Sequence, residues 1–205
     1  MSTKKLAICV PIRDTIHSGF TYCLTELVAK LVSDGIEYKL YFENGSILPD
    51  QRNRLVESAK RDECTEILWL DSDMVFPPDV YFALSKRKRS VVACNYSTRH
   101  WPFRSVAFTS DKDMDKRLTK RKGLHEVASV GMGVMLTDMK VFEKLHLPYF
   151  SFKYDRKTES YIGEDIEFCR TARDYDFKIY VDADLSEKCA HLGTAPRRMD
   201  MIEDV

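Results

Sequence analysis

Two aspartates one residue apart, Asp71 and Asp73, are the first side chains in the sequence whose type and spacing point to chemistry. They directly follow residues 67–70, an apolar run typical of a short strand buried on both faces. Ligands of open α/β sheets bind at the carboxyl ends of strands. No lysine or arginine is adjacent in sequence, so two carboxylates there favour a hard divalent cation. The plainer alternative is an acidic turn that caps the next helix.

A second acidic pair, Glu164 and Asp165, follows Gly163 at the predicted start of a helix. The helix macrodipole favours carboxylates there, so a capping pair is the simplest interpretation. Such a carboxylate could also accept a proton from a hydroxyl as a general base. His191 comes later, before Leu192 and a glycine. It could be an ordinary hydrogen-bonded loop residue or a metal ligand.

The elements that must position these residues follow from hydrophobic periodicity. Strands are predicted at residues 6–10, 36–42 and 67–70, with helices at 18–33 and 49–63 between them. This alternation predicts a Rossmann-like, mostly parallel sheet with helices on both faces. The sequence lacks the G-x-G-x-x-G turn of dinucleotide enzymes and the lysine loop of P-loop proteins.

Composition narrows the class of protein. A chain of 205 residues suffices for one domain, so we expect a single domain over residues 1–195 and a tail over 196–205 that could be mobile. Lysine plus arginine equals aspartate plus glutamate at 32 each, which argues against a nucleic-acid partner. Six cysteines without a CxxC pair favour a reducing, cytoplasmic compartment. No apolar run approaches the roughly 18 residues of a transmembrane helix.

The ordered set of a buried strand ending in Asp-x-Asp, a later Gly-Glu-Asp at a helix start and a late His-x-Gly resembles the nucleotide-sugar glycosyltransferases of GT-A fold. The compact forms found in large DNA viruses and phages are especially similar. The resemblance covers the chain to about residue 195. It implies an α/β, GT-A-type fold with a Rossmann-like mostly parallel sheet, helices on both faces and a small additional antiparallel sheet. It would place a viral protein in the host cytoplasm.

The resemblance also implies an activity. A hexosyl or deoxyhexosyl group would move from a nucleotide-diphosphate sugar, with a UDP-sugar favoured, to a hydroxyl of a glycan or glycoconjugate acceptor. Asp71, Asp73 and His191 would bind Mn²⁺ or Mg²⁺, which stabilises the leaving diphosphate. Asp165 would be the general base and Glu164 would bind sugar or acceptor hydroxyls. In a retaining enzyme the same two carboxylates would orient the acceptor, and the sequence leaves the stereochemistry open.

Donor-binding residues are assigned by the same resemblance. The loops after the first two strands would hold the base and ribose. Arg52 could pair with a phosphate or the base. The residues that follow the third strand would also contact the donor. Tyr96 and Met132 would face the sugar, or else pack in the core, and two glycines would let the backbone approach the donor. The assigned residues are Pro11, Ile12, Arg13, Asn44, Gly45, Ser46, Arg52, Asp71, Ser72, Tyr96, Gly131, Met132 and Gly133.

Two other functions fit parts of the sequence. In a haloacid-dehalogenase-like phosphatase, Asp71 would be the nucleophile and Asp73 the acid/base. That motif usually lies on the first strand of its domain, whereas two strands precede it here, and residues 163–165 are a poor substitute for that family's Gly-Asp-Gly motif. A module that binds nucleotide sugars or glycans without turnover would keep the same pocket.

Overall fold

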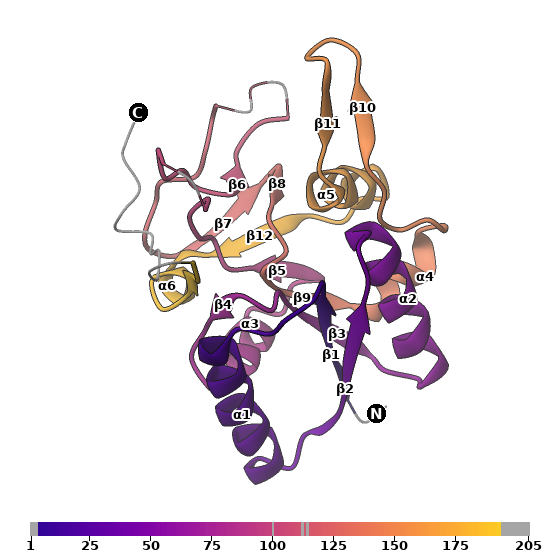
Figure 1. The fold of residues 1–205 in the computed structure, drawn as a ribbon, viewed down its shortest axis with the longest axis vertical. Helices are drawn as coiled ribbons and strands as arrows, with labels where there is room; N and C mark the ends of the chain where they lie inside the picture. Colours follow the sequence, from indigo (N-terminus) through magenta and orange to yellow (C-terminus); the bar gives the residue numbers. More distant parts are fainter. Residues whose placement is uncertain (1–3, 100, 112, 114, 194–205) are drawn as a thin grey trace.

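The computed structural model describes residues 4–99, 101–111, 113 and 115–193. The tail expected at residues 196–205 lies outside this part of the chain. A seven-stranded sheet forms the centre of the molecule (Figure 1). Its strands, in spatial order, are β2 (Glu37–Asn44), β1 (Lys5–Ile12), β3 (Glu66–Leu70), β9 (Val134–Asp138), β5 (Val91–Ala93), β12 (Ile179–Asp182) and β7 (Leu124–Val127).

The sheet is mostly parallel, as predicted. The first three strands pair in parallel, as do β5 and β12. Only β9 and β7 run in the opposite direction, since β9 is antiparallel to both of its neighbours and β7 is antiparallel to β12. Strand β3 lies between β1 and β9, and all five of its residues are buried. Burial on both faces fixes the position of the strand, and therefore of the residues that follow its carboxyl end.

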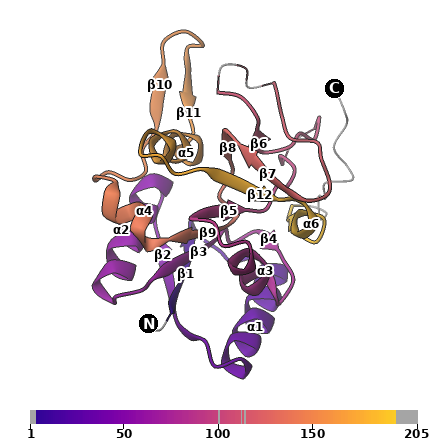
Figure 2. The same ribbon diagram turned by 180° about the vertical axis from the view of Figure 1, so that it is seen from behind.

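Helices cover both faces of the sheet, and each face has its own apolar core. On one face lie α1 (Ser18–Ser33) and α3 (Val80–Lys86), where Phe20 and Leu84 join Leu68 and Leu70 of β3. On the other face lie α2 (Leu48–Arg61), α4 (Met139–Lys144) and α5 (Glu164–Asp174). Figures 1 and 2 show the two helix groups on opposite sides of the strands. The alternation of β3 side chains explains why its residues supply both cores.

Three small antiparallel pairs and a short helix complete the fold. The pairs join β4 (Met74–Val75) to β13 (Ala190–His191), β6 (Ala107–Phe108) to β8 (Ser129–Val130), and β10 (Lys153–Asp155) to β11 (Ser160–Ile162). The hairpin of β10 and β11 projects beyond α5, and α6 (Ala183–Ser186) follows β12 (Figure 2). Among the described residues, no helix combines the length and the apolar character needed to cross a membrane.

Candidate active site

Asp71 lies at the end of β3, where its backbone N–H donates to the carbonyl of Gly133 at 3.0 Å. Its Oδ1 accepts a hydrogen bond of 2.8 Å from Nη2 of Arg52 on α2. Arg52 is 1% exposed, and its Nε lies 3.3 Å from Oε1 of Glu164, which begins α5. The buried guanidinium of Arg52 thus joins Asp71 and Glu164, which are far apart in the sequence.

The expected pairing of Arg52 with a phosphate or the base stays a prediction, and two of its donor atoms already have partners. Its Nη2 and Nε are already bonded to carboxylates. Burial acts to lower the pKa of Arg52, but the charges of Asp71 and Glu164 outweigh that effect and raise it. The structure therefore assigns Arg52 a positioning contact with the two acidic groups. It also shows that Asp71, without a basic neighbour in sequence, has one in space.

Asp73 and His191 lie next to each other, as the resemblance implies. Oδ2 of Asp73 is 3.1 Å from Nε2 of His191. The backbone enforces this contact: His191 pairs with Met74 in the β4–β13 ladder, and Leu192 N–H donates to the carbonyl of Asp73 at 2.7 Å. Nδ1 of His191 lies 3.2 Å from the carbonyl of Ser97. Because that carbonyl can only accept, it holds the proton on Nδ1 and directs Nε2 toward Asp73.

A third group, Arg99, completes this cluster and was missed by the sequence analysis. Its Nη2 donates to Oδ2 of Asp73, and its Nε lies 2.9 Å from Nε2 of His191. Burial acts to raise the pKa of Asp73, and the charge of Arg99 acts to lower it. Nothing in the local sequence distinguishes Arg99 from a solvated surface arginine.

A cavity of about 210 Å³ opens beside the two aspartates. Its walls come from the ends of β1, β2 and β3, as expected for a ligand site in an open α/β sheet. Seven of the predicted donor or metal residues line it, together with three that were not predicted. The lining residues are Pro11, Arg13, Gly45, Ser46, Asp71, Ser72 and Asp73, and Leu48, Gln51 and Arg99.

Ile12 and Asn44, also predicted at this site, contribute to its frame. They pair with each other at the ends of β1 and β2, and neither lines the cavity. The Ile12 carbonyl accepts the N–H of Gly45 at 3.0 Å. The side-chain amide of Gln51 donates to the carbonyls of Ile12 and Glu43. Gln51 therefore fastens the first turn of α2 to both strand ends, which shapes the cavity floor.

The second acidic pair forms the first turn of α5, with Gly163 as its N-cap. Glu164 is 6% exposed and bonded to Arg52. Oδ1 of Asp165 accepts the N–H of Ile166 at 2.8 Å. Burial and the charge of Glu164 raise the pKa of Asp165 to about 7, despite the opposing effects of this hydrogen bond and of Arg52. A carboxyl group with this pKa can take up or release a proton near neutral pH.

Tyr96 and Met132 are 6% and 1% exposed, so both pack in the core in this structure. The Tyr96 hydroxyl accepts the N–H of Gly133 at 2.9 Å. A Cβ at Gly131 or Gly133 would lie 2.5 or 2.7 Å from that hydroxyl. Close packing against Tyr96 therefore gives a structural reason for both glycines. Their predicted approach to the donor remains a prediction.

The separation of Asp73 and His191 fits two neighbouring ligands of a divalent cation. Neighbouring ligands of an octahedral ion with bonds of about 2.1 Å are separated by about 3 Å. The 3.1 Å between Oδ2 of Asp73 and Nε2 of His191 matches that separation. Among the described residues, no group of three or more His, Cys, Asp or Glu side chains could hold a metal ion. Asp73 and His191 fit a site completed by oxygens of water or of a bound diphosphate, with Asp71 turned to Arg52.

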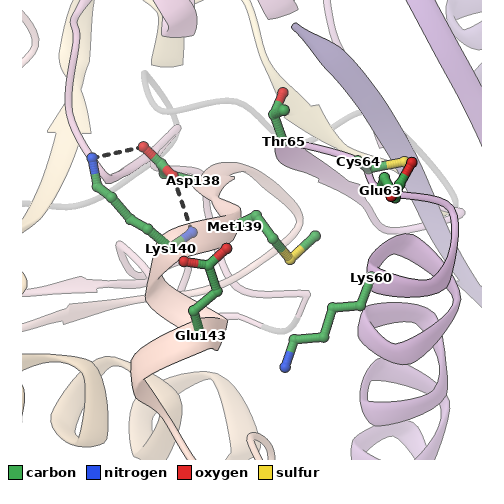
Figure 3. Close-up of a pocket in the computed structure, with 8 residues that line it drawn as sticks. All are labelled: Lys60, Glu63, Cys64, Thr65, Asp138, Met139, Lys140 and Glu143. Atoms are coloured by element: carbon green, nitrogen blue, oxygen red, sulfur yellow. Dashed lines mark hydrogen bonds and ion pairs between the residues drawn. The ribbon is translucent and has the colours of Figure 1, made fainter. Parts of the chain in front are cut away.

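A larger cavity, of about 710 Å³, lies at the opposite end of β3 (Figure 3). It lies between the end of α2 and the start of α4, and the two lysines that line it already have partners. Lys60 donates to the carbonyl of Phe142 at 3.0 Å, and Lys140 pairs with Asp138 at 2.7 Å. Its lining residues are Lys60, Glu63, Cys64, Thr65, Asp138, Met139, Lys140 and Glu143. None of the predicted site residues takes part.

Comparison with known proteins identifies the fold. No protein-family model and no curated protein matches the chain. Among solved structures, A197 from STIV matches 93% of this chain and 86% of its own, with a TM-score of 0.59 and 19% identity. A mutant of the Drosophila β1,4-galactosyltransferase 7, in complex with manganese, UDP-Gal and xylobiose, matches 93% of this chain and 71% of its own. That match has a TM-score of 0.54 and 13% identity.

These similarities concern the fold. The seven-stranded, mostly parallel sheet with helices on both faces and small antiparallel pairs is the GT-A-type architecture predicted from the sequence. The chain thus has the fold of nucleotide-sugar glycosyltransferases.

Proposed function

We propose that the protein is a metal-dependent glycosyltransferase that moves a sugar from a nucleotide-diphosphate sugar, with a UDP-sugar favoured, to a hydroxyl of a glycan acceptor. The observation that carries this proposal is the pair formed by Asp73 and His191, 3.1 Å apart beside a cavity at the strand ends. The phosphatase alternative has no comparable support. Its nucleophile, Asp71, has one carboxylate oxygen bonded to a buried arginine.

The residues divide into three roles. Asp73 and His191 would hold the cation, for which Mn²⁺ suits a carboxylate and imidazole site and Mg²⁺ is the alternative. The cation, when bound, supplies Lewis-acid stabilisation to the departing diphosphate. Pro11, Arg13, Gly45 and Ser46 line the cavity in which the nucleotide would lie. Asp71 and Glu164 are held by Arg52, which fixes the donor side and the acceptor side relative to each other.

Asp165 is the proposed general base. As the acceptor oxygen forms a bond to the anomeric carbon, the bond from that carbon to the diphosphate oxygen breaks. The acceptor proton passes to the Asp165 carboxylate, which is ionised above its pKa of about 7. Glu164, bonded to Arg52, would accept hydrogen bonds from sugar hydroxyls with its remaining lone pairs. The galactosyltransferase structure with manganese, UDP-Gal and xylobiose supports this choice of cation, donor and acceptor class.

The proposal is tested by measuring free nucleoside diphosphate released from a panel of UDP-, GDP- and CDP-sugars with Mn²⁺. Release that requires both one donor and a glycan acceptor is expected. A binding module would retain the nucleotide and release none. A phosphatase would instead trap a phosphate mimic on Asp71 and need no nucleotide. Either of these two results would replace the proposed function.

A further inference from the structure

The guanidinium of Arg99 lies where the proposed cation would bind. It contacts Oδ2 of Asp73 through Nη2 and Nε2 of His191 through Nε, at 2.9 Å for the latter. These are the same two atoms whose 3.1 Å separation fits neighbouring metal ligands. Nε2 of His191 has a single lone pair, which it can direct at either the guanidinium or the ion. Occupation by Arg99 and occupation by a metal therefore exclude each other.

The tautomer of His191 strengthens this conclusion. The Ser97 carbonyl, 3.2 Å from Nδ1, holds the imidazole proton on that nitrogen. In the neutral ring Nε2 then has a free lone pair, which Arg99 uses as an acceptor in this structure. A metal-bound histidine commonly has the same arrangement, with its other ring nitrogen donating to a backbone carbonyl. His191 therefore has the tautomer that a metal ligand needs, and its Nε2 accepts a hydrogen bond from the positively charged Arg99 instead.

Arg99 can leave this position without disturbing the sheet. Its side chain is 57% exposed, against 23% for Asp73 and 10% for His191. The loop that carries it is closed at its base, where Thr98 N–H donates to the Arg104 carbonyl at 2.8 Å and Arg104 N–H to Thr98 Oγ1 at 3.1 Å. Rotation of the Arg99 side chain into solvent breaks neither contact. The backbone of Arg99 would stay beside the cavity that this residue lines.

We propose that Arg99 sets the affinity of the site for a divalent cation by competing with it for Asp73 and His191. This inference rests on the metal site of the proposed function. Removing the competitor should strengthen metal binding. Because ion pairs with an exposed partner contribute little stability, the gain for Arg99→Ala is expected to be about fivefold in the dissociation constant. Arg99→Lys should bind metal with intermediate affinity, because one ammonium does not reproduce the planar fork of donors.

The test is a titration of the complete chain with Mn²⁺ alone, following free Mn²⁺ by electron paramagnetic resonance, so that no turnover is involved. Arg104→Ala is the matched control, since it removes the same charge from the same loop and its partner is Asp115 at 3.8 Å. Tighter binding by Arg99→Ala, with Arg104→Ala equal to the wild type, supports competition. An equal gain in both variants indicates a general charge effect and overturns the inference. Weaker or unchanged binding by Arg99→Ala also overturns it.

Asp73→Asn separates failure of this inference from failure of the proposed function. If Asp73→Asn loses Mn²⁺ while Arg99→Ala and the wild type bind equally, only the role of Arg99 is wrong. If Asp73→Asn binds like the wild type, or if no form binds Mn²⁺, the metal site itself is wrong and the inference fails with it. Arg99→Lys guards against an effect of side-chain truncation, because it should also bind more tightly than the wild type.

Discussion

Nε2 of His191 lies 3.1 Å from Oδ2 of Asp73, although the two residues are 118 positions apart in the chain. The contact depends on backbone pairing. The two-residue ladder between β4 and β13 places His191 opposite Met74, directly after Asp73. The hydrogen bond from Leu192 N–H to the Asp73 carbonyl, at 2.7 Å, fixes the register. A carboxylate and an imidazole are thus held together by the fold, independently of any bound ligand.

Replacing Asp165 with asparagine tests the assignment of the general base. The amide has nearly the same shape but cannot accept the proton at neutral pH. We expect turnover to fall about 10²-fold or more, the usual contribution of a general base, with donor binding retained. Steady-state kinetics and a donor titration measure the two effects. Asp174→Asn, at the exposed end of the same helix, is the control and should keep full turnover. Unchanged turnover in Asp165→Asn would remove this residue from the mechanism.

The pH dependence of turnover should report the same carboxyl group. Burial and the charge of Glu164 raise the pKa of Asp165 to about 7, and only the ionised form accepts a proton. We therefore expect kcat/KM to rise about tenfold per pH unit below this pKa and to level off above it. Glu164→Gln removes the neighbouring negative charge, so it should shift the midpoint to lower pH. A profile that is flat from about pH 5 to pH 8 would contradict the assignment.

Arg52 should contribute strongly to stability. In Arg52→Ala, Asp71 and the buried Glu164 lose their shared cation. Breaking a buried ion pair by removing one partner typically costs about 3–5 kcal/mol. Urea unfolding measures this cost.

The matched control for Arg52 is Arg54→Ala, two residues along the same helix. The Arg54 side chain is 61% exposed, and it pairs with Glu43 and Asp50 at 3.2 and 2.7 Å. Exposed pairs contribute up to about 1 kcal/mol, so this variant should be nearly as stable as the wild type. Equal losses in the two variants would show that the buried position of Arg52 has no special importance.

The close packing of Gly131 against Tyr96 predicts coupling between the two positions. In Gly131→Ala the new Cβ would lie 2.5 Å from the Tyr96 hydroxyl, so overpacking should cost about 1–3 kcal/mol. Tyr96→Phe removes that oxygen and leaves the N–H of Gly133 without its acceptor, which carries its own cost. The double variant should then lose less than the sum of the two single changes. Additive losses in urea unfolding would contradict the packing account.

Helices and strands could be predicted from the sequence where their apolar residues recur over enough positions to show a period. The helix expected at residues 18–33 has those bounds in the structure, and the helix expected at 49–63 forms at Leu48–Arg61. The apolar run at 67–70 predicted β3, all five residues of which are buried. Each of these depends on periodicity and burial, which neighbouring residues determine.

Other features could not be predicted because they depend on tertiary contacts. Strands β4 and β13 have two residues each, too few to show a period. Arg99 looks like a solvated loop residue in sequence, and Arg52 is expected there to pair with a phosphate or the base, yet each pairs with an aspartate of the site. The position of an arginine in the sequence does not show which distant carboxylate it will pair with in the fold.

The central claim is that Asp73 and His191 hold a divalent cation that binds the donor diphosphate. Calorimetric titration of UDP, GDP and CDP into the protein, with Mn²⁺ and with a chelator, tests it most directly. We expect one nucleotide, with UDP favoured, to bind at least about tenfold more tightly with Mn²⁺, and Asp73→Asn to lose this difference. Equal affinity with and without metal for all three nucleotides, or a metal effect that persists in Asp73→Asn, would contradict the claim.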